Sequence, residues 1–289
     1  MRKVAIVTDT TACVPQEQAA KHDIEVVPVQ LIIGGKTYRD GIDISPAEFY
    51  ALLRQAKKIP STSSSSPEPY LEAYRRAGQK APSVLCLTEP SRFSAMFDSA
   101  RIAMEMARKA LQNVVVEVIE GTTAAAGMGL VALAAARAAA MGKTLHDVVE
   151  VARKTMSRVN LFVTLDTLNY LVKSGRVPQA AALVNSLLSI KPIFTLDHNG
   201  ARTVALPRTT ESAMKQTLKL MEKKVVRGHP LHVAVMHADV PDNAVALKDR
   251  ISSMFECDEI FITEFTPVMG VHTGPGLIGV AFYGEDLST

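Results

Sequence analysis

Hydroxyl side chains recur at four places in this 289-residue chain where a ligand could be bound. Three of the segments follow β-rich runs and read TDTT (8–11), TEPSRFS (88–94) and EGTT (120–123), and the fourth is STSSSS (61–66). Because parallel strands end at a common edge of their sheet, we expect these hydroxyls to gather there. Hydroxyls and helix N-terminal amides bind carboxylate or phosphate oxygens. The alternative is that each Ser or Thr is an ordinary helix N-cap.

His272 is the histidine with the most unusual surroundings, because glycines bracket it in PVMGVHTGPGLIGVAF (267–282). Glycines permit close backbone approach and unusual dihedral angles, so an imidazole on such a turn is a candidate partner for an oxyanion. The alternative is a histidine that merely shares a glycine-rich hairpin. We expect the other six histidines to be surface residues or to be satisfied by neighbours.

Two arginines are candidate cations near such a site. The segment YLVKSGRV (170–177) ends a predicted helix at Gly175, which leaves Arg176 on an exposed loop. Arg208 lies at the end of a predicted strand.

An enzymatic interpretation stays open at this point. A small hydrolase or acyl transferase could use Ser94 as the nucleophile and His272 as the base. Such a site needs a carboxylate to orient the histidine, and the sequence offers Asp9 only as a guess.

Motifs for cofactors and metals are missing or misplaced. The segment GPGLIG (274–279) fits G-x-G-x-x-G, but a predicted strand rather than a helix follows it. The sequence has no P-loop, no G-x-S-x-G elbow, no H-E-x-x-H and no paired-cysteine metal site. We therefore expect no cofactor and no metal.

The elements that must position these residues alternate between strands and helices in the first half of the chain. Predicted strands cover 3–8, 24–33, 83–88 and 114–120, and predicted helices include 45–58, with Ser45 and Glu48 at capping-box spacing. The second half has further strands, a tight hairpin turn at DHNG (197–200), and helices near 178–189, 209–226 and 241–255. The pattern predicts an α/β protein of two domains: a parallel α/β/α N-terminal domain (1–157) and a smaller mixed-sheet α/β C-terminal domain (158–289).

Composition limits the class of partner. The net charge of +3 gives no reason to expect nucleic acid. The scattered cysteines Cys13, Cys86 and Cys257 are typical of reduced thiols in a cytoplasmic protein, and the apolar run after Met1 is too short for a signal peptide. The alanine-rich stretch 124–142, interrupted by Arg137, predicts a buried helix rather than a membrane span.

Taken together, several segments resemble the DegV family, the bacterial fatty-acid-binding proteins that serve a fatty-acid kinase. The resemblance covers nearly the whole chain. It rests on TDTTACVP (8–15), the segment 28–50, P-x-T-S at 60–63, LNYLVKSGRV with SIKPIF, and GVHTGPGLIGVAF. It implies two α/β domains with a fatty acid buried between them, and a separate kinase that phosphorylates the lipid carboxylate to an acyl phosphate for phospholipid synthesis.

The resemblance also assigns roles to single residues. Thr62 and Ser94 fall on the carboxylate-binding hydroxyls, with His272 and Arg208 near the head group and Arg176 presenting the ligand to the kinase. Ser63, Thr122 and Thr123 are further candidates among the hydroxyls described above. This chain departs from the family's T-S-Q-P with TSSS and from S-G-T-Y with SAMF. The run 61–66 is accordingly predicted to be a binding loop, with a linker as the alternative.

A lipid ligand suits the apolar helices of this sequence. A chain of roughly 15 methylenes gains on the order of 12 kcal/mol gross when buried. The helices at 99–111, 124–141 and 179–189 are rich in Ala, Leu and Met and could line a tunnel, although each could equally be ordinary core. We also expect transient contact with a membrane while lipid is exchanged.

Overall fold

The computed structural model describes residues 2–56, 58–63, 66–178, 180–181, 190–197, 200–226 and 228–284. Its first layer is a parallel four-stranded sheet with the order β2-β1-β6-β7. The strands are β1 (Val4–Asp9), β2 (Ile24–Val27), β6 (Ser83–Thr88) and β7 (Val115–Glu120). The predicted parallel α/β sheet is confirmed.

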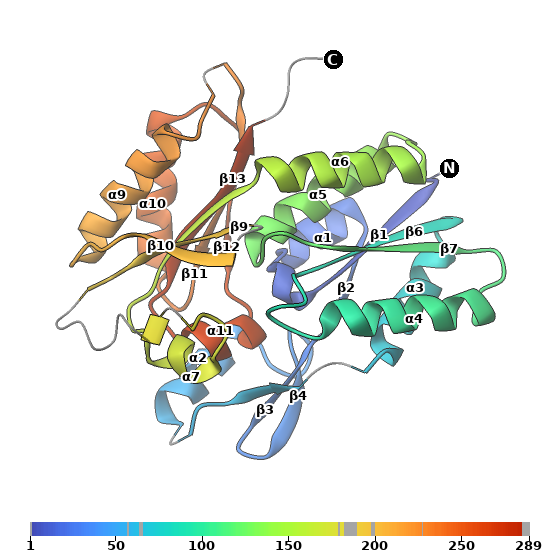
Figure 1. Ribbon diagram of the computed structural model, residues 1–289, viewed down its shortest axis with the longest axis horizontal. Helices are drawn as coiled ribbons and strands as arrows, with labels where there is room; N and C mark the ends of the chain where they lie inside the picture. The colour runs from blue at the N-terminus through green and yellow to red at the C-terminus, as the bar shows by residue number, and fades with distance from the viewer. Residues whose placement is uncertain are drawn as a thin grey trace.

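Helices cover both faces of this sheet (Figure 1). Alternate residues of β1 point to opposite faces: Val4 and Ile6 pack with one set of helices, and Ala5 and Val7 with the other. The first set is α1 (Gln16–His22), α5 (Ala126–Ala140) and α6 (Leu145–Arg158), and the second is α3 (Glu68–Gly78) and α4 (Met96–Ala110). All six residues of β1 are buried for this reason.

A mixed six-stranded sheet forms the second layer, with the order β10-β9-β8-β13-β11-β12. It contains β8 (Asn160–Thr164), β9 (Ile193–Asp197), β10 (Gly200–Ala205), β11 (Leu231–His237), β12 (Cys257–Glu264) and β13 (Ile278–Gly284). Among the described strands of this sheet, only the β11–β12 pairing is parallel. Helices α9 (Thr210–Glu222) and α10 (Pro241–Met254) pack on one face.

The alanine-rich helix α5 lies between the two sheets (Figure 1). Thirteen of its 15 residues are buried, and Leu130 and Ala134 pack against Met236 and Ala281 of the second sheet. Small side chains allow both sheets to approach the same helix closely. None of the helices in the described part of the chain is both long and apolar enough to cross a membrane.

The prediction of one strand over 24–33 was wrong. The chain leaves the parallel sheet after Val27, and Gln30–Ile33 (β3) joins a separate antiparallel sheet with the order β4-β3-β5. Pro28 separates the two strands because proline has no N–H for the ladder. The partners of β3 are β4 (Lys36–Arg39) and β5 (Ser61–Ser63).

The serine-rich run is therefore neither a linker nor a free loop over its first three residues, because Ser61–Ser63 form β5 and pair with β3. Ser64 and Ser65 lie outside the described residues. The helix before it, α2 (Pro46–Gln55), has the predicted capping box: the Glu48 N–H donates to the Ser45 hydroxyl at 3.3 Å, and the Ser45 N–H donates to the Glu48 carboxylate at 2.9 Å.

Other predictions in the second half are confirmed in part. Asp197 of β9 pairs with Gly200 of β10 in antiparallel fashion, as the hairpin at 197–200 requires, although 198–199 lie outside the described residues. The predicted helix 178–189 falls mostly on 182–189, which also lie outside them. Helix α6 ends at Arg158 and β8 begins at Asn160, close to the predicted domain boundary, which stays a prediction.

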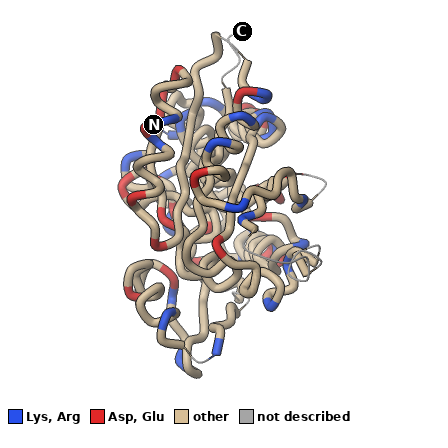
Figure 2. Tube along the Cα trace, turned by 90° about the vertical axis from the view of Figure 1, so that its left-hand side faces the viewer, with Lys and Arg blue, Asp and Glu red and all other residues tan. Residues whose placement is uncertain are grey.

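Hydrogen bonds join the two halves of the chain. The Tyr50 hydroxyl donates to the Phe265 carbonyl at 3.0 Å, and the Thr263 hydroxyl donates to the Cys13 carbonyl at 2.6 Å. Figure 2 shows Lys and Arg interspersed with Asp and Glu along the chain, in keeping with the small net charge of +3.

Candidate functional site

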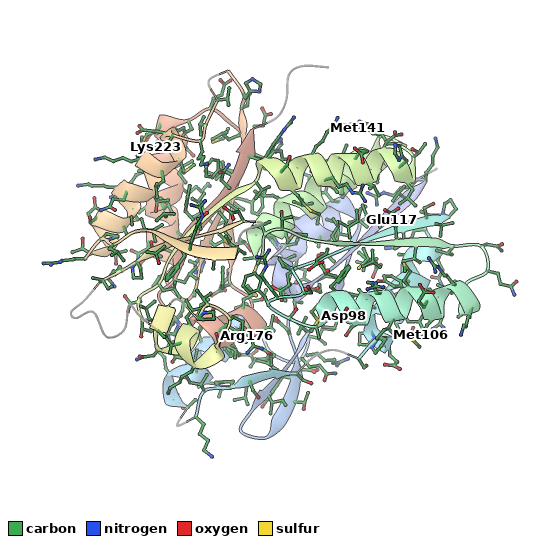
Figure 3. All side chains as sticks on the ribbon, in the orientation of Figure 1. Asp98, Met106, Glu117, Met141, Arg176 and Lys223 are labelled. Atoms are coloured by element: carbon green, nitrogen blue, oxygen red, sulfur yellow. The ribbon has the colours of Figure 1, made fainter. Side chains whose placement is uncertain are left out.

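Polar residues from both halves of the chain converge where β1 and β6 end. Strand β1 leads into the short 3₁₀ segment Thr10–Ala12, and β6 is followed by Glu89 and the turn before α4. The second half contributes α7 (Asn169–Ser174) and α11 (Pro267–Thr273). Gly175 ends α7 in the left-handed conformation, and Arg176, which follows it, is exposed, as predicted. Figure 3 labels Arg176 close to α7 and α11.

The structure corrects the expected setting of His272. We expected a glycine-rich turn or hairpin, but His272 lies in the last turn of α11. Gly270 is inside this helix, where an added Cβ would lie 2.6 Å from the Phe49 ring and 2.7 Å from the Tyr50 hydroxyl oxygen. Glycine is therefore needed there for the close packing of α11 on α2.

A cavity of about 200 Å³ contains this polar cluster. Its polar side chains come from several elements and are those of Thr11, Thr62, Ser63, Glu89, Ser94, Arg176, Thr195, His272 and Thr273. Most of the remaining lining is apolar and includes Met96, Leu161, Val163, Leu165, Leu171, Val177, Phe194, Leu196, Phe265, Met269 and Leu277. The site thus joins a group of hydrogen-bonding side chains to an apolar space.

The imidazole of His272 lies beside the Thr62 hydroxyl and within electrostatic reach of Arg176. Its Nε2 lies 3.4 Å from the Thr62 hydroxyl oxygen, and its buried Nδ1 has no hydrogen-bond partner among the described residues. Burial, with a smaller contribution from the Arg176 charge, lowers the pKa of His272 to about 4. The imidazole is therefore neutral at pH 7.

Glu89 is an acid in the same cavity that the sequence analysis did not single out. The residue is 6% exposed and lines the cavity beside Ser94. Burial raises the pKa of Glu89 to about 8; the nearby Asp9 adds to this shift, and Ser94 and Arg176 oppose it. The sequence did contain a signal for Glu89, because this residue directly follows the apolar run SVLCLT (83–88) at a predicted strand end. At that strand end we considered only the hydroxyls.

Five of the predicted site residues line this one cavity: Thr62, Ser63, Ser94, Arg176 and His272. Three do not. Thr122 and Thr123 line a different cavity with Arg153 and Ser157, which shares only Leu196 with the first among the described lining residues. Arg208 is exposed and is not among the lining residues of the first cavity. The roles of all eight residues stay predictions.

The arrangement needed for a hydrolase is not formed among the described residues. Asp9 accepts hydrogen bonds from Thr11 and from the Tyr70 hydroxyl, the latter at 2.7 Å, rather than from His272. His272 Nε2 lies beside the Thr62 hydroxyl, no hydrogen bond joins Ser94 to His272 among the described residues, and Nδ1 of His272 has no carboxylate partner there. A nucleophile–base–acid series requires both a contact from Ser94 to His272 and a contact from His272 to a carboxylate. Nor does any group of His, Cys, Asp or Glu within the described ranges have an arrangement that could hold a metal ion.

Solved structures of other proteins share this fold. A DegV family protein from Thermus thermophilus, whose structure is described as showing fatty acid binding, has a TM-score of 0.89 at 27% identity; the match covers 98% of this chain and 100% of that one. DegV from Bacillus subtilis, described as a fatty acid binding protein, has a TM-score of 0.88 at 26% identity, with 99% and 100% covered. The predicted α/β fold class is thereby confirmed.

Sequence comparisons agree with the structural ones. The family model described as "Uncharacterised protein, DegV family" matches residues 3–285. A DegV domain-containing protein from Streptomyces coelicolor is 33% identical over 281 residues, which is 96% of this chain and 98% of that protein. With these matches over nearly its whole length, the chain belongs to the DegV family.

Proposed function

We propose that this protein binds a long-chain fatty acid, with its carboxylate at Thr62, Ser94 and His272 and its acyl chain in the apolar part of the cavity. The observation that carries the proposal is the cavity itself, which joins hydrogen-bonding side chains to an apolar lining from both halves of the chain. The fatty acid binding described for the Thermus thermophilus and Bacillus subtilis proteins supports it.

The head-group chemistry fits a carboxylate. Hydroxyl and imidazole N–H donors form charge-assisted hydrogen bonds to a carboxylate, which are roughly twice as strong as neutral ones. Nδ1 of His272 is buried without a partner among the described residues, and a ligand oxygen would satisfy it. Because His272 is neutral at pH 7, it contributes a hydrogen bond rather than a full charge.

Burial of the acyl chain supplies most of the affinity. Each methylene contributes about 0.8 kcal/mol, so roughly 15 methylenes give on the order of 12 kcal/mol before the costs of association are subtracted. Leu161, Leu165, Phe194 and Leu277 belong to the cavity lining and present the apolar surface that this requires.

We further propose that the bound carboxylate is presented to a separate kinase in the cytoplasm, which forms an acyl phosphate for phospholipid synthesis. Arg176 is exposed and also lines the cavity, so it can meet both a partner and the head group. The chain has no P-loop motif of its own. Enclosure would protect an acyl phosphate from water. On this proposal the protein is a carrier and co-substrate rather than a catalyst.

Denaturing mass spectrometry of the purified protein tests lipid binding. We expect a stoichiometric fatty acid with the parent and its loss in the Thr62→Val/Ser94→Ala double variant, because a buried carboxylate without its donors costs several kcal/mol. Ser91→Ala is the matched control, since Ser91 bonds to Glu120 and does not line the cavity. A double variant that retains stoichiometric lipid would refute the head-group assignment.

Kinase assays test the role of Arg176. With a fatty-acid kinase supplied, we expect Arg176→Ala to reduce acyl phosphate formation more than tenfold, and to reduce lipid retention less. Arg108→Ala, which removes an exposed cation of α4, is the control. Equal rates for Arg176→Ala and the parent would remove this role from Arg176.

Hydrolysis of simple acyl esters separates carrier from enzyme. We expect no hydrolysis by the parent above that in buffer. Hydrolysis that disappears in His272→Gln would instead support the hydrolase interpretation, since loss of a general base typically costs about two to four orders of magnitude in rate.

A further inference from the structure

Glu89 is a buried acid in the head-group cavity to which the proposed function gives no task. It follows the last residue of β6, is 6% exposed and lines the cavity with Thr62, Ser94 and His272. An acid there would ordinarily weaken a site for a carboxylate, because two like charges in one buried cavity repel each other. Its presence therefore needs a reason.

The hydrogen bonds of Ser94 suggest one. A serine hydroxyl has a single hydrogen to donate and two lone pairs that accept. The backbone N–H of Met96 donates to the Ser94 oxygen at 3.3 Å. Ser94 and Glu89 line the same cavity, and the Ser94 hydroxyl is near enough to the Glu89 carboxyl to lower its pKa by hydrogen bonding. If Glu89 is ionised, it can only accept, so it takes the one hydrogen of Ser94 and leaves none for a ligand.

We propose that Glu89 is a positioning residue: when protonated it donates to Ser94, which turns the Ser94 hydrogen toward the bound carboxylate, so that the lipid and one proton bind together. This inference rests on the proposed function. The proton balance is simple, because the proton is either on Glu89 beforehand or is taken from solvent on binding. Ser94 then accepts from Met96 and Glu89 and donates to the ligand, which uses its full hydrogen-bonding capacity.

The surrounding charges favour the protonated form of Glu89. The elements around it carry charged or titratable side chains at Asp9, Cys13, Arg92, Asp98, Glu120, Arg176 and His272. Asp9 raises the pKa of Glu89, and Arg176 opposes it but is exposed. His272 is neutral at pH 7 and adds no positive charge. A ligand carboxylate adds a further negative charge and raises the pKa of Glu89 again.

Proton-coupled binding gives a defined pH profile. Below pH 8 the acid is mostly protonated in the free protein, since its pKa is about 8, and affinity changes little. Above that pH a proton must be taken up, so the Kd for a carboxylate rises by up to about tenfold per pH unit. A fatty alcohol can donate its own hydrogen, so its Kd should not rise in this range.

Calorimetric titration of lipid-free protein with palmitate, below the concentration at which palmitate forms micelles, tests the inference. Titrations at pH 7, 8, 9 and 9.5 give the pH profile, and buffers of different ionisation enthalpy give the number of protons taken up. We expect close to one proton at pH 9 for the parent. Glu89→Gln should bind palmitate with a flat profile and no proton uptake, because the Gln amide donates to Ser94 at every pH.

Glu120→Gln is the matched control, because this acid ends the neighbouring strand β7 but binds Ser91 and does not line the cavity. It should keep the parent's profile. A parent that binds palmitate with a flat profile and takes up no proton overturns the inference about Glu89 and leaves the proposed function standing. A parent that binds no palmitate at any of these pH values overturns both.

Discussion

Asp40 offers a quantitative test of how burial controls the stability of this fold. It is 1% exposed, and its Oδ2 accepts a hydrogen bond from the Val268 N–H at 3.1 Å, at the start of the helix that carries His272. Its Oδ1 has no partner among the described residues. Burial raises the pKa of Asp40 to about 7, against the hydrogen bond from the Val268 N–H and the nearby Thr10 and Thr266 hydroxyls, which lower it.

The sign of the effect follows from proton linkage. The folded state holds the Asp40 proton up to a higher pH than the unfolded state does. The stability that protonated Asp40 contributes is therefore complete below the unfolded pKa of 3.8 and is lost as the pH rises toward 7. Each pKa unit corresponds to about 1.36 kcal/mol. Between pH 5 and pH 7 the parent should therefore lose about 2–3 kcal/mol relative to an Asp40→Asn variant, which cannot ionise.

Urea unfolding followed by far-UV circular dichroism measures this difference, since the chain has no tryptophan for fluorescence. The free energies of unfolding of parent and Asp40→Asn should diverge steadily from pH 5 to pH 7 and run parallel above pH 8. Asp43→Asn is the control, because the pKa of Asp43 is about 2 and lies below this range. Curves for the parent and Asp40→Asn that stay parallel throughout would refute the reasoning.

Two further predictions concern packing and capping around the site. Gly270→Ala places a methyl group 2.6 Å from the Phe49 ring, so we expect the free energy of unfolding to fall by about 1–3 kcal/mol and lipid retention to drop with it; an unchanged urea midpoint would contradict this. Ser45→Ala removes the capping box of α2 and should cost about 1 kcal/mol, measured by the same unfolding assay, whereas Ser45→Asp should cost less because it can still cap; equal losses would argue against a capping role.

Local residue patterns were enough to predict the regular elements. Alternation of β-rich runs and amphipathic helices predicted the parallel sheet, because a strand buried on both faces must be apolar over most of its length, as β1 is from Val4 to Val7. Ser45 and Glu48 located the start of α2, because capping depends on only four consecutive residues. Gly175 likewise located the end of α7 and placed Arg176 on the surface.

Sequence periodicity could not show where one sheet ends and another begins. The run IEVVPVQLII (24–33) is rich in β-forming residues on both sides of Pro28, yet Val27 and Gln30 belong to different sheets, since the partners of each strand are distant in sequence. Similarly, the glycines around His272 suggested a turn, whereas Gly270 instead allows α11 to pack against α2.

The sequence by itself thus determined which residues could form strands, helices and caps, because those preferences depend on neighbours a few positions away. Only the tertiary structure decided which hydroxyls share a cavity: Thr62 and Ser94 do, whereas Thr122 and Thr123, in an equally suggestive motif, line another one. It also placed Glu89 beside Ser94 in a buried space. Burial and charge depend on contacts between residues far apart in the chain, and these change the chemistry of an acid that the sequence alone leaves ordinary.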